Sequence, residues 1–160
     1  MTRHLKRSMP ENFAGFRSVS ALRPGVLATS GLESADCVRA FCSAVSPAAV
    51  VVVDALAASD LSRLGSTVQV TDAGIAPGSG VGNDRAELSA AYLGVPVAAV
   101  GVPTVVDAGA FSNDKTASGM FVTPRNIDDL VRRTGKLIGY GIDLALHSGL
   151  TCGDVDMLVE

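Results

Sequence analysis

The sequence predicts an α/β protein with three layers built around a mostly parallel sheet. Three observations predict this fold class. The valine run Val50–Val53 is typical of a strand that is buried on both faces. Apolar strand-like segments alternate with segments of helical periodicity, as in repeated βα units. The chain has 160 residues, which fits a single domain over 1–160.

The first predicted elements precede the valine run. Residues 17–21 alternate between polar and apolar side chains, which predicts a short strand before Pro24. Residues 31–45 are predicted to form a helix, since their apolar side chains recur at helical spacing. These side chains are Val38, Phe41, Cys42 and Val45.

The middle of the chain is predicted to hold the sheet. Residues 49–54 form a strand, after which 55–58 have the composition of a helix start. Residues 67–72 alternate and predict a second strand, and the apolar segment 95–103, bounded by prolines, predicts a third. Between these strands lie a glycine-rich loop, 74–83, and a predicted helix, 84–93.

The last part of the chain is predicted to be helical. Residues 104–110 fit no element clearly, and 111–118 read as a polar loop. Thr123 and Pro124 are typical of the cap and first position of a helix, which the following apolar stripe extends to about His147. Residues 151–159 are predicted to form a short final helix.

Composition excludes several function classes. With 13 Lys and Arg against 16 Asp and Glu, the net charge is −3, so direct nucleic-acid binding is not expected. The longest apolar run, 48–53, is too short to span a bilayer, and no secretory signal opens the chain. Three cysteines without metal-ligand spacing read as free thiols, which fits a cytoplasmic location. Neither a metal site nor a cofactor is expected.

Asp54 is the foremost candidate for chemistry. A carboxylate at the end of a valine-rich strand is partly desolvated, which raises its pKa and suits proton transfer. It is equally well interpreted as a cap of the helix expected to follow. Asp72 and Asp107 also end apolar runs and are better interpreted as cap or turn residues.

The glycine-rich loop is the second candidate. It lacks the Gly-Lys-Ser/Thr ending of a P-loop, which disfavours phosphate binding, and Ser79 has no histidine in a recognisable catalytic arrangement. The loop is better interpreted as lying over a site, with backbone N–H groups that bind a peptide carbonyl or an oxyanion. Its candidate residues are Gly78, Ser79, Gly80, Gly82 and Asn83.

Several blocks along the chain together resemble the germination protease (spore protease) family. The resemblance covers nearly the whole chain in order, although the segment from Gly109 to Phe121 is shorter than in the family. The blocks that carry it are Thr2–Leu5, Ser18–Leu22, Ser30–Asp36, Val53–Ala58, Pro77–Asn83, Gly101–Ala108 and Val122–Pro124.

The resemblance implies a phosphorylase/hydrolase-like fold related to the hydrogenase-maturation proteases. It also implies an atypical aspartate-dependent endopeptidase, made as a zymogen and assembled as a homotetramer. Such enzymes begin the degradation of small acid-soluble spore proteins in the spore core during germination. One catalytic aspartate of the family corresponds to Asp54.

The family's other catalytic aspartate lies in a Thr-Pro-Asp-Ala-Leu-Gly-Pro block upstream of Thr2, so this chain is expected to be an amino-terminally truncated form. The alternative is a catalytically inactive paralogue, or a fragment that serves as a scaffold or oligomer subunit. A second alternative is a small-molecule or nucleotide-binding domain that uses the glycine-rich loop.

Overall fold

The computed structural model describes residues 6–82, 85–112 and 115–159. They belong to two compact units, one formed by Leu22–Ile127 and the other by Met1–Ala21 together with Asp128–Glu160. Within the described part of the chain, no helix combines the length and apolar character needed to cross a membrane.

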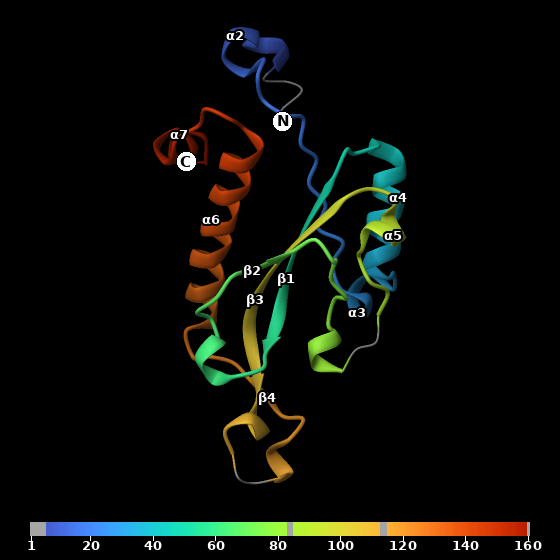
Figure 1. The fold of residues 1–160 in the computed structure, drawn as a ribbon, viewed down its shortest axis with the longest axis vertical. Coiled ribbons are helices and arrows are strands. Elements are labelled where there is room, and N and C mark those ends of the chain that lie inside the picture. Colours follow the sequence, from blue (N-terminus) through green and yellow to red (C-terminus); the bar gives the residue numbers. More distant parts are fainter. Residues whose placement is uncertain (1–5, 83–84, 113–114, 160) are drawn as a thin grey trace. The chain divides into compact units, whose positions relative to one another are not determined.

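The larger unit is built on a mixed sheet (Figure 1). Its strands within the described residues are β1 (Val50–Ala58), β2 (Gln69–Thr71), β3 (Val97–Asp107) and β4 (Phe121–Val122). β3 pairs in parallel with β1 and antiparallel with both β2 and β4. The α/β class is confirmed, but parallel pairing is limited to β1 and β3.

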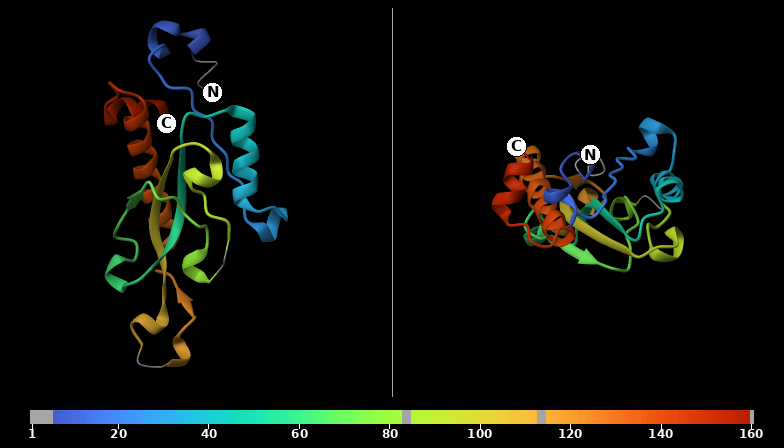
Figure 2. Two further views of the ribbon diagram at one scale, coloured as in Figure 1. Left: turned by 45° about the vertical axis from the view of Figure 1, so that its right-hand side comes forward. Right: turned by 90° about the horizontal axis from the view of Figure 1, so that it is seen from above.

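One face of β1 and β3 carries the core of this unit. Val50 and Val52 of β1 pack against a buried cluster of Ala35, Leu88, Leu93 and Val97. Ala35 comes from helix α4 (Ser34–Val45) and Leu93 from the short helix α5 (Ala90–Leu93). Figures 1 and 2 show α4 alongside the strands in each view, so helices form a layer on this face.

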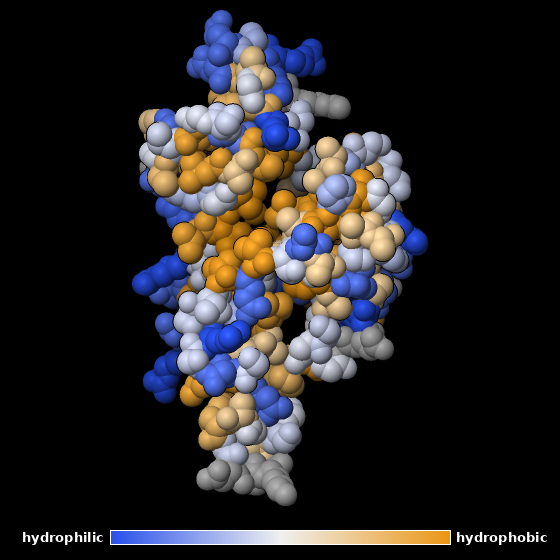
Figure 3. Space-filling model, in the orientation of Figure 1, coloured by the Kyte–Doolittle hydropathy of each residue, from blue (hydrophilic) through white to orange (hydrophobic). Residues whose placement is uncertain are grey.

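The alternate side chains of β1 point to the other face and are partly exposed. Val51 is 42% and Val53 50% exposed, and Val70 of β2, which is paired to the same position of β3 as Val53, is 71% exposed. Apolar surface is visible in Figure 3 where the strands cross the middle of the view. The valine run is therefore buried on one face rather than on both.

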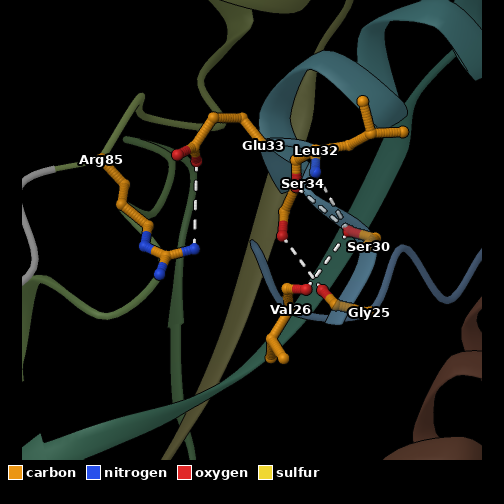
Figure 4. Close-up of polar contacts among 7 residues, drawn as sticks. All are labelled: Gly25, Val26, Ser30, Leu32, Glu33, Ser34 and Arg85. Atoms are coloured by element: carbon orange, nitrogen blue, oxygen red, sulfur yellow. Dashed lines mark hydrogen bonds and ion pairs between the residues drawn. The ribbon is translucent and has the colours of Figure 1, made fainter. Parts of the chain in front are cut away.

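Helix α4 begins after a short capped turn (Figure 4). Helix α3 (Leu27–Ser30) ends at Gly31, whose positive φ of 69° suits glycine. The Ser30 hydroxyl accepts the Leu32 N–H at 3.2 Å, and the Ser34 hydroxyl donates to the Gly25 carbonyl at 3.2 Å. The Arg85 guanidinium lies 3.9 Å from the Glu33 carboxylate, beside the start of α4.

The smaller unit contains helices α2 (Pro10–Phe13), α6 (Ile127–Leu146) and α7 (Cys152–Val159). His147, only 8% exposed, stacks on the Phe16 ring, and its Nδ1 accepts the Arg17 N–H at 3.2 Å. Asp156 of α7 accepts hydrogen bonds from Lys136 and Tyr140 of α6. These contacts join the amino-terminal segment and the two long helices of this unit.

Several predicted elements are corrected by the structure. Residues 17–21 form no strand in the structure. The helix expected from 55 is wrong, because β1 continues to Ala58 in register with β3. Asp84 lies outside the described residues, and within 85–93 the expected helix is confined to Ala90–Leu93, because Leu88 instead forms an antiparallel bridge with Ile75.

The third strand and the long helix also differ from expectation. β3 runs past Pro103 to Asp107, which places the ambiguous residues 104–107 in the sheet. Helix α6 begins at Ile127 rather than beside Pro124, because the Thr123 hydroxyl donates to the Thr104 carbonyl at 2.8 Å instead of capping a helix. The helices predicted over 31–45, up to 147 and over 151–159 are otherwise confirmed.

Short 3₁₀ turns connect the strands of the larger unit. Among the described residues they are η1 (Leu61–Arg63), η2 (Ser79–Val81), η3 (Ala108–Ala110) and η4 (Lys115–Ala117). Asp107 bonds both ends of the loop between β3 and β4, since its two carboxylate oxygens accept the N–H groups of Gly109 and Gly119 at 2.7 and 2.9 Å. Its interpretation as a cap residue is confirmed.

Candidate functional site

Asp54 lies in the middle of β1 rather than at its end. No helix begins after it, so its interpretation as a helix cap is wrong. Its partner position on β3 is Gly101, which has no side chain, and the Leu56 side chain occupies the space where a side chain at Gly101 would lie. The Leu56 side chain thus covers the β3 position that is paired with Asp54.

Burial governs the titration of Asp54. Desolvation raises the pKa of its carboxyl, and a hydrogen bond from the Ala55 N–H opposes this rise. No second carboxylate among the described residues contributes to the shift. Asp54 is therefore a half-buried acid whose raised pKa lets it hold its proton to a higher pH than an exposed aspartate does.

The glycine-rich loop lies directly against the strand that carries Asp54. A Cβ atom added to Gly80 would lie 2.8 Å from the Ala57 Cβ and 3.2 Å from the Ala57 N, so only glycine permits this approach. Glycines with positive φ, Gly78 at 77° and Gly82 at 79°, flank η2 on either side. The sequence pattern thus identified a loop that closes onto β1.

The loop and two strands together line an open hollow of ≈ 200 Å³, and its lining on β1 begins one residue after Asp54. Gly78 and Gly80 line it, whereas Asp54, Ser79 and Gly82 are not among its lining residues. The complete lining is Ala55, Leu56, Ala57, Gly78, Gly80, Val81, Thr104 and Val105. Asn83 lies outside the described residues.

Part of the loop's backbone is already engaged. The N–H groups of Ser79 and Gly82 bond the carbonyls of Ala76 and Ser79, each within the turn. The Val81 N–H likewise bonds the Gly78 carbonyl at 3.1 Å. These three groups hold the loop in shape rather than facing a ligand.

Thr104 is a lining residue with a polar side chain that the sequence did not single out. It is the extra residue of a bulge, because Leu56 pairs with Pro103 whereas the next residue, Ala57, pairs with Val105. The proline is the available sequence signal, since a proline inside a strand lacks the N–H that a regular ladder needs. Within the described residues, no group of three His, Cys, Asp or Glu side chains is arranged to hold a metal ion.

Comparison with known proteins identifies the family of this chain. The germination protease family model matches residues 1–120. The chain is 35% identical to the germination protease of Clostridium acetobutylicum over 201 residues, and 36% identical to that of Caldanaerobacter subterraneus over the same length. It is 42% identical to that of Bacillus mycoides over 164 residues.

The chain therefore belongs to the germination protease family. All of it is covered in each of these comparisons, but it spans only 62% of the length of the first two relatives and 42% of the third. The alignments over 201 residues also exceed the 160 residues of this chain, so those relatives contain residues for which this chain has no counterpart.

Proposed function

We propose that this chain contributes Asp54 to an endopeptidase that begins the degradation of small acid-soluble spore proteins during germination. The observation that carries the proposal is the position of Asp54. It is a desolvated carboxylate on the strand whose next three residues line the hollow, and it lies in the block that resembles the family's catalytic segment. Membership of the germination protease family supports peptide hydrolysis as the reaction.

In the proposed mechanism, a water molecule attacks the carbonyl carbon of the scissile peptide bond. One carboxylate takes a proton from this water. The other carboxyl group, which is protonated, donates a hydrogen bond to the carbonyl oxygen and then gives its proton to the leaving amine. Burial suits Asp54 to such an exchange because its neutral and ionised forms are closer in free energy near neutral pH. The second carboxylate is proposed to be an aspartate outside these 160 residues.

The glycine-rich loop is proposed to bind the substrate backbone next to Asp54. Since the N–H groups of Ser79 and Gly82 are engaged within the turn, we assign this role to Gly78 and Gly80, which line the hollow. Asn83 remains a candidate from the sequence alone.

The finer features implied by the resemblance belong to the same proposal. They are a phosphorylase/hydrolase-like fold related to the hydrogenase-maturation proteases, synthesis as a zymogen, a homotetramer, and location in the spore core. The exposed valines of β1 and β2 are consistent with an association of subunits, because such apolar surface favours contact with a partner.

One observation favours a second candidate function, that of a non-catalytic scaffold or oligomer subunit. Asp54 has no neighbouring carboxylate among the described residues that shifts its pKa, so these residues contain half of an aspartate pair. A lone carboxylate provides a weaker route to peptide hydrolysis than a pair that shares a proton.

Cleavage of an intact small acid-soluble spore protein by the natural full-length product separates the two functions. We expect the wild-type protein to cleave it and Asp54→Asn to lower the rate by at least about 100-fold, the usual contribution of a proton-transfer group. Asp60→Asn, a matched exposed aspartate in the same unit, is expected to leave the rate unchanged. Cleavage retained by Asp54→Asn would exclude Asp54 from the mechanism, and inactive wild-type protein would favour the scaffold function.

A further inference from the structure

Thr104, the extra residue of the bulge in β3, lines an otherwise apolar hollow. Thr104 is the only lining residue with a polar side chain in the part of the chain that the structure describes. The other lining residues are alanines, glycines, valines and a leucine. A hollow with apolar walls and one hydrogen-bonding group is the usual composition of a small binding site.

The bulge is fixed from two sides. The Pro103 carbonyl accepts the Gly65 N–H at 2.7 Å, and the Thr104 carbonyl accepts the Thr123 hydroxyl at 2.8 Å. Carbonyls at the irregular point of the strand are thus bonded by segments outside the β1–β3 ladder. These contacts hold the backbone of the bulge, so the position of Thr104 at the hollow is set by the fold.

The opposite wall is equally fixed. Gly80 approaches Ala57 so closely that a methyl group at Gly80 would not fit. The distance between the loop and the strand is therefore determined by the backbone of one and a small side chain of the other. A volume of ≈ 200 Å³ equals that of several water molecules and accommodates one aliphatic side chain with the adjoining peptide group.

We propose that this hollow binds an extended peptide segment, with an aliphatic side chain against the alanine and valine walls and a main-chain peptide group hydrogen-bonded to the Thr104 hydroxyl. A threonine hydroxyl both donates and accepts, so it suits either the N–H or the carbonyl of a peptide. As a statement about substrate binding, this inference rests on the proposed function. It makes Thr104, which lies in β3 between the residues paired with Leu56 and Ala57, a substrate-contacting residue two to three strand positions beyond Asp54.

Binding of labelled peptides by the 160-residue chain tests this inference without requiring cleavage. The probes are fluorescein-labelled decapeptides that differ at one central position, with Leu, Val, Ala, Lys or Asp, and fluorescence anisotropy gives the Kd. All proteins carry Asp54→Asn so that the peptides stay intact. Thr104→Val removes the hydroxyl at nearly constant shape, Thr104→Ser retains it, and Thr29→Val alters an exposed threonine of α3 as the matched control.

We expect the aliphatic peptides to bind more tightly than those with Lys or Asp. Thr104→Val should weaken the binding of every peptide by about 3- to 10-fold, as expected for one lost hydrogen bond, whereas Thr104→Ser and Thr29→Val should bind as the parent does. Unchanged binding by Thr104→Val, equal weakening by Thr104→Ser, or a parent that binds none of the peptides would each overturn the inference.

Failure of the proposed function gives a different pattern. A full-length wild-type protein that binds these peptides through Thr104 but cleaves no spore protein would contradict the peptidase proposal and leave the peptide site in place. If the full-length protein cleaves the spore protein, and Thr104→Val changes neither the rate nor the KM, the peptidase proposal stands and the proposed peptide site is wrong. Thermal unfolding of Thr104→Val verifies that the variant folds.

Discussion

At the scale of single residues, Asp54 differs from the other carboxylates of its unit in what surrounds it. Asp60 and Asp107 accept hydrogen bonds from nearby N–H groups and thereby act as caps. Asp54 accepts a hydrogen bond from the Ala55 N–H, and burial is the larger influence on its pKa. The sequence predicted this desolvation from the valine run, but the absence of a following helix depended on pairing with β3.

The raised pKa of Asp54 predicts how Asp54→Asn changes stability with pH. Because the folded-state pKa is raised, ionisation opposes folding, so the stability present below the ordinary aspartate pKa declines as pH rises through the raised value. Asparagine cannot ionise. Urea unfolding should therefore show Asp54→Asn gaining stability relative to wild type from acidic to neutral pH.

Asp60 provides a control of opposite sign. Hydrogen bonds from the Ser62 hydroxyl and N–H lower the pKa of Asp60, so its contribution to stability is present above the ordinary pKa and is lost on acidification. Asp60→Asn should be less stable than wild type at neutral pH, with the difference shrinking in acid. If Asp54→Asn were also less stable than wild type at neutral pH, burial would not be the main influence on the pKa of Asp54.

At the scale of elements, contacts with residues distant in the sequence set the secondary structure where the local sequence pattern predicted it wrongly. The segment 55–58 has helix-forming composition, yet its backbone continues the parallel ladder from Ala55 opposite Val102 to Ala58 opposite Val106. Thr123 and Pro124 have the pattern of a helix start, but the Thr123 hydroxyl has a partner 19 residues earlier in β3. Long-range partners of this kind leave no local signal in one sequence.

The contact between the glycine-rich loop and β1 predicts a specific defect in Gly80→Ala. The added methyl would lie 2.8 Å from the Ala57 Cβ, so the loop must move away from the strand. We expect a loss of about 1–3 kcal/mol in the free energy of unfolding, measured by urea denaturation. Gly80→Ala combined with Ala57→Gly should recover part of this loss, and no recovery would show that the contact is not its cause.

In helix α6, replacing a glycine by alanine is expected to stabilise the protein, in contrast to Gly80→Ala. A Cβ added at Gly135 or Gly139 meets no atom within 4 Å, and both residues lie inside the helix. Alanine at either position should raise the free energy of unfolding of the smaller unit by about 0.5–1 kcal/mol, because glycine loses more backbone freedom than alanine on forming a helix. If thermal unfolding showed lower stability instead, the glycine would be needed for a close contact that a methyl group blocks.

At the scale of the whole molecule, the chain divides into two compact units, and the single domain expected over 1–160 stays a prediction. The motif-level resemblance identified the family correctly, because long blocks such as Gly101–Ala108 retain their order in the chain. Thr104 lies inside that block, yet its place in the hollow follows from a register shift that no motif specifies. Family membership was thus predictable from sequence, whereas the composition of the hollow was not.

The exposed valines predict self-association of the chain. Val70 is 71% exposed on the same sheet face as Val53. Val70→Thr keeps a β-branched residue in the strand and reduces apolar surface, so it should lower the associated fraction in sedimentation velocity measurements. A wild-type chain that stays monomeric at all concentrations would contradict this prediction.

The central claim is that β1 presents a desolvated carboxyl group suited to proton transfer. The most direct measurement is a ¹³C NMR titration of the Asp54 side-chain carboxyl, assigned by comparison with Asp54→Asn. The account predicts a midpoint above the ordinary value of 3.8, with Asp60 titrating below that value in the same sample. A midpoint for Asp54 at or below 3.8 would contradict it.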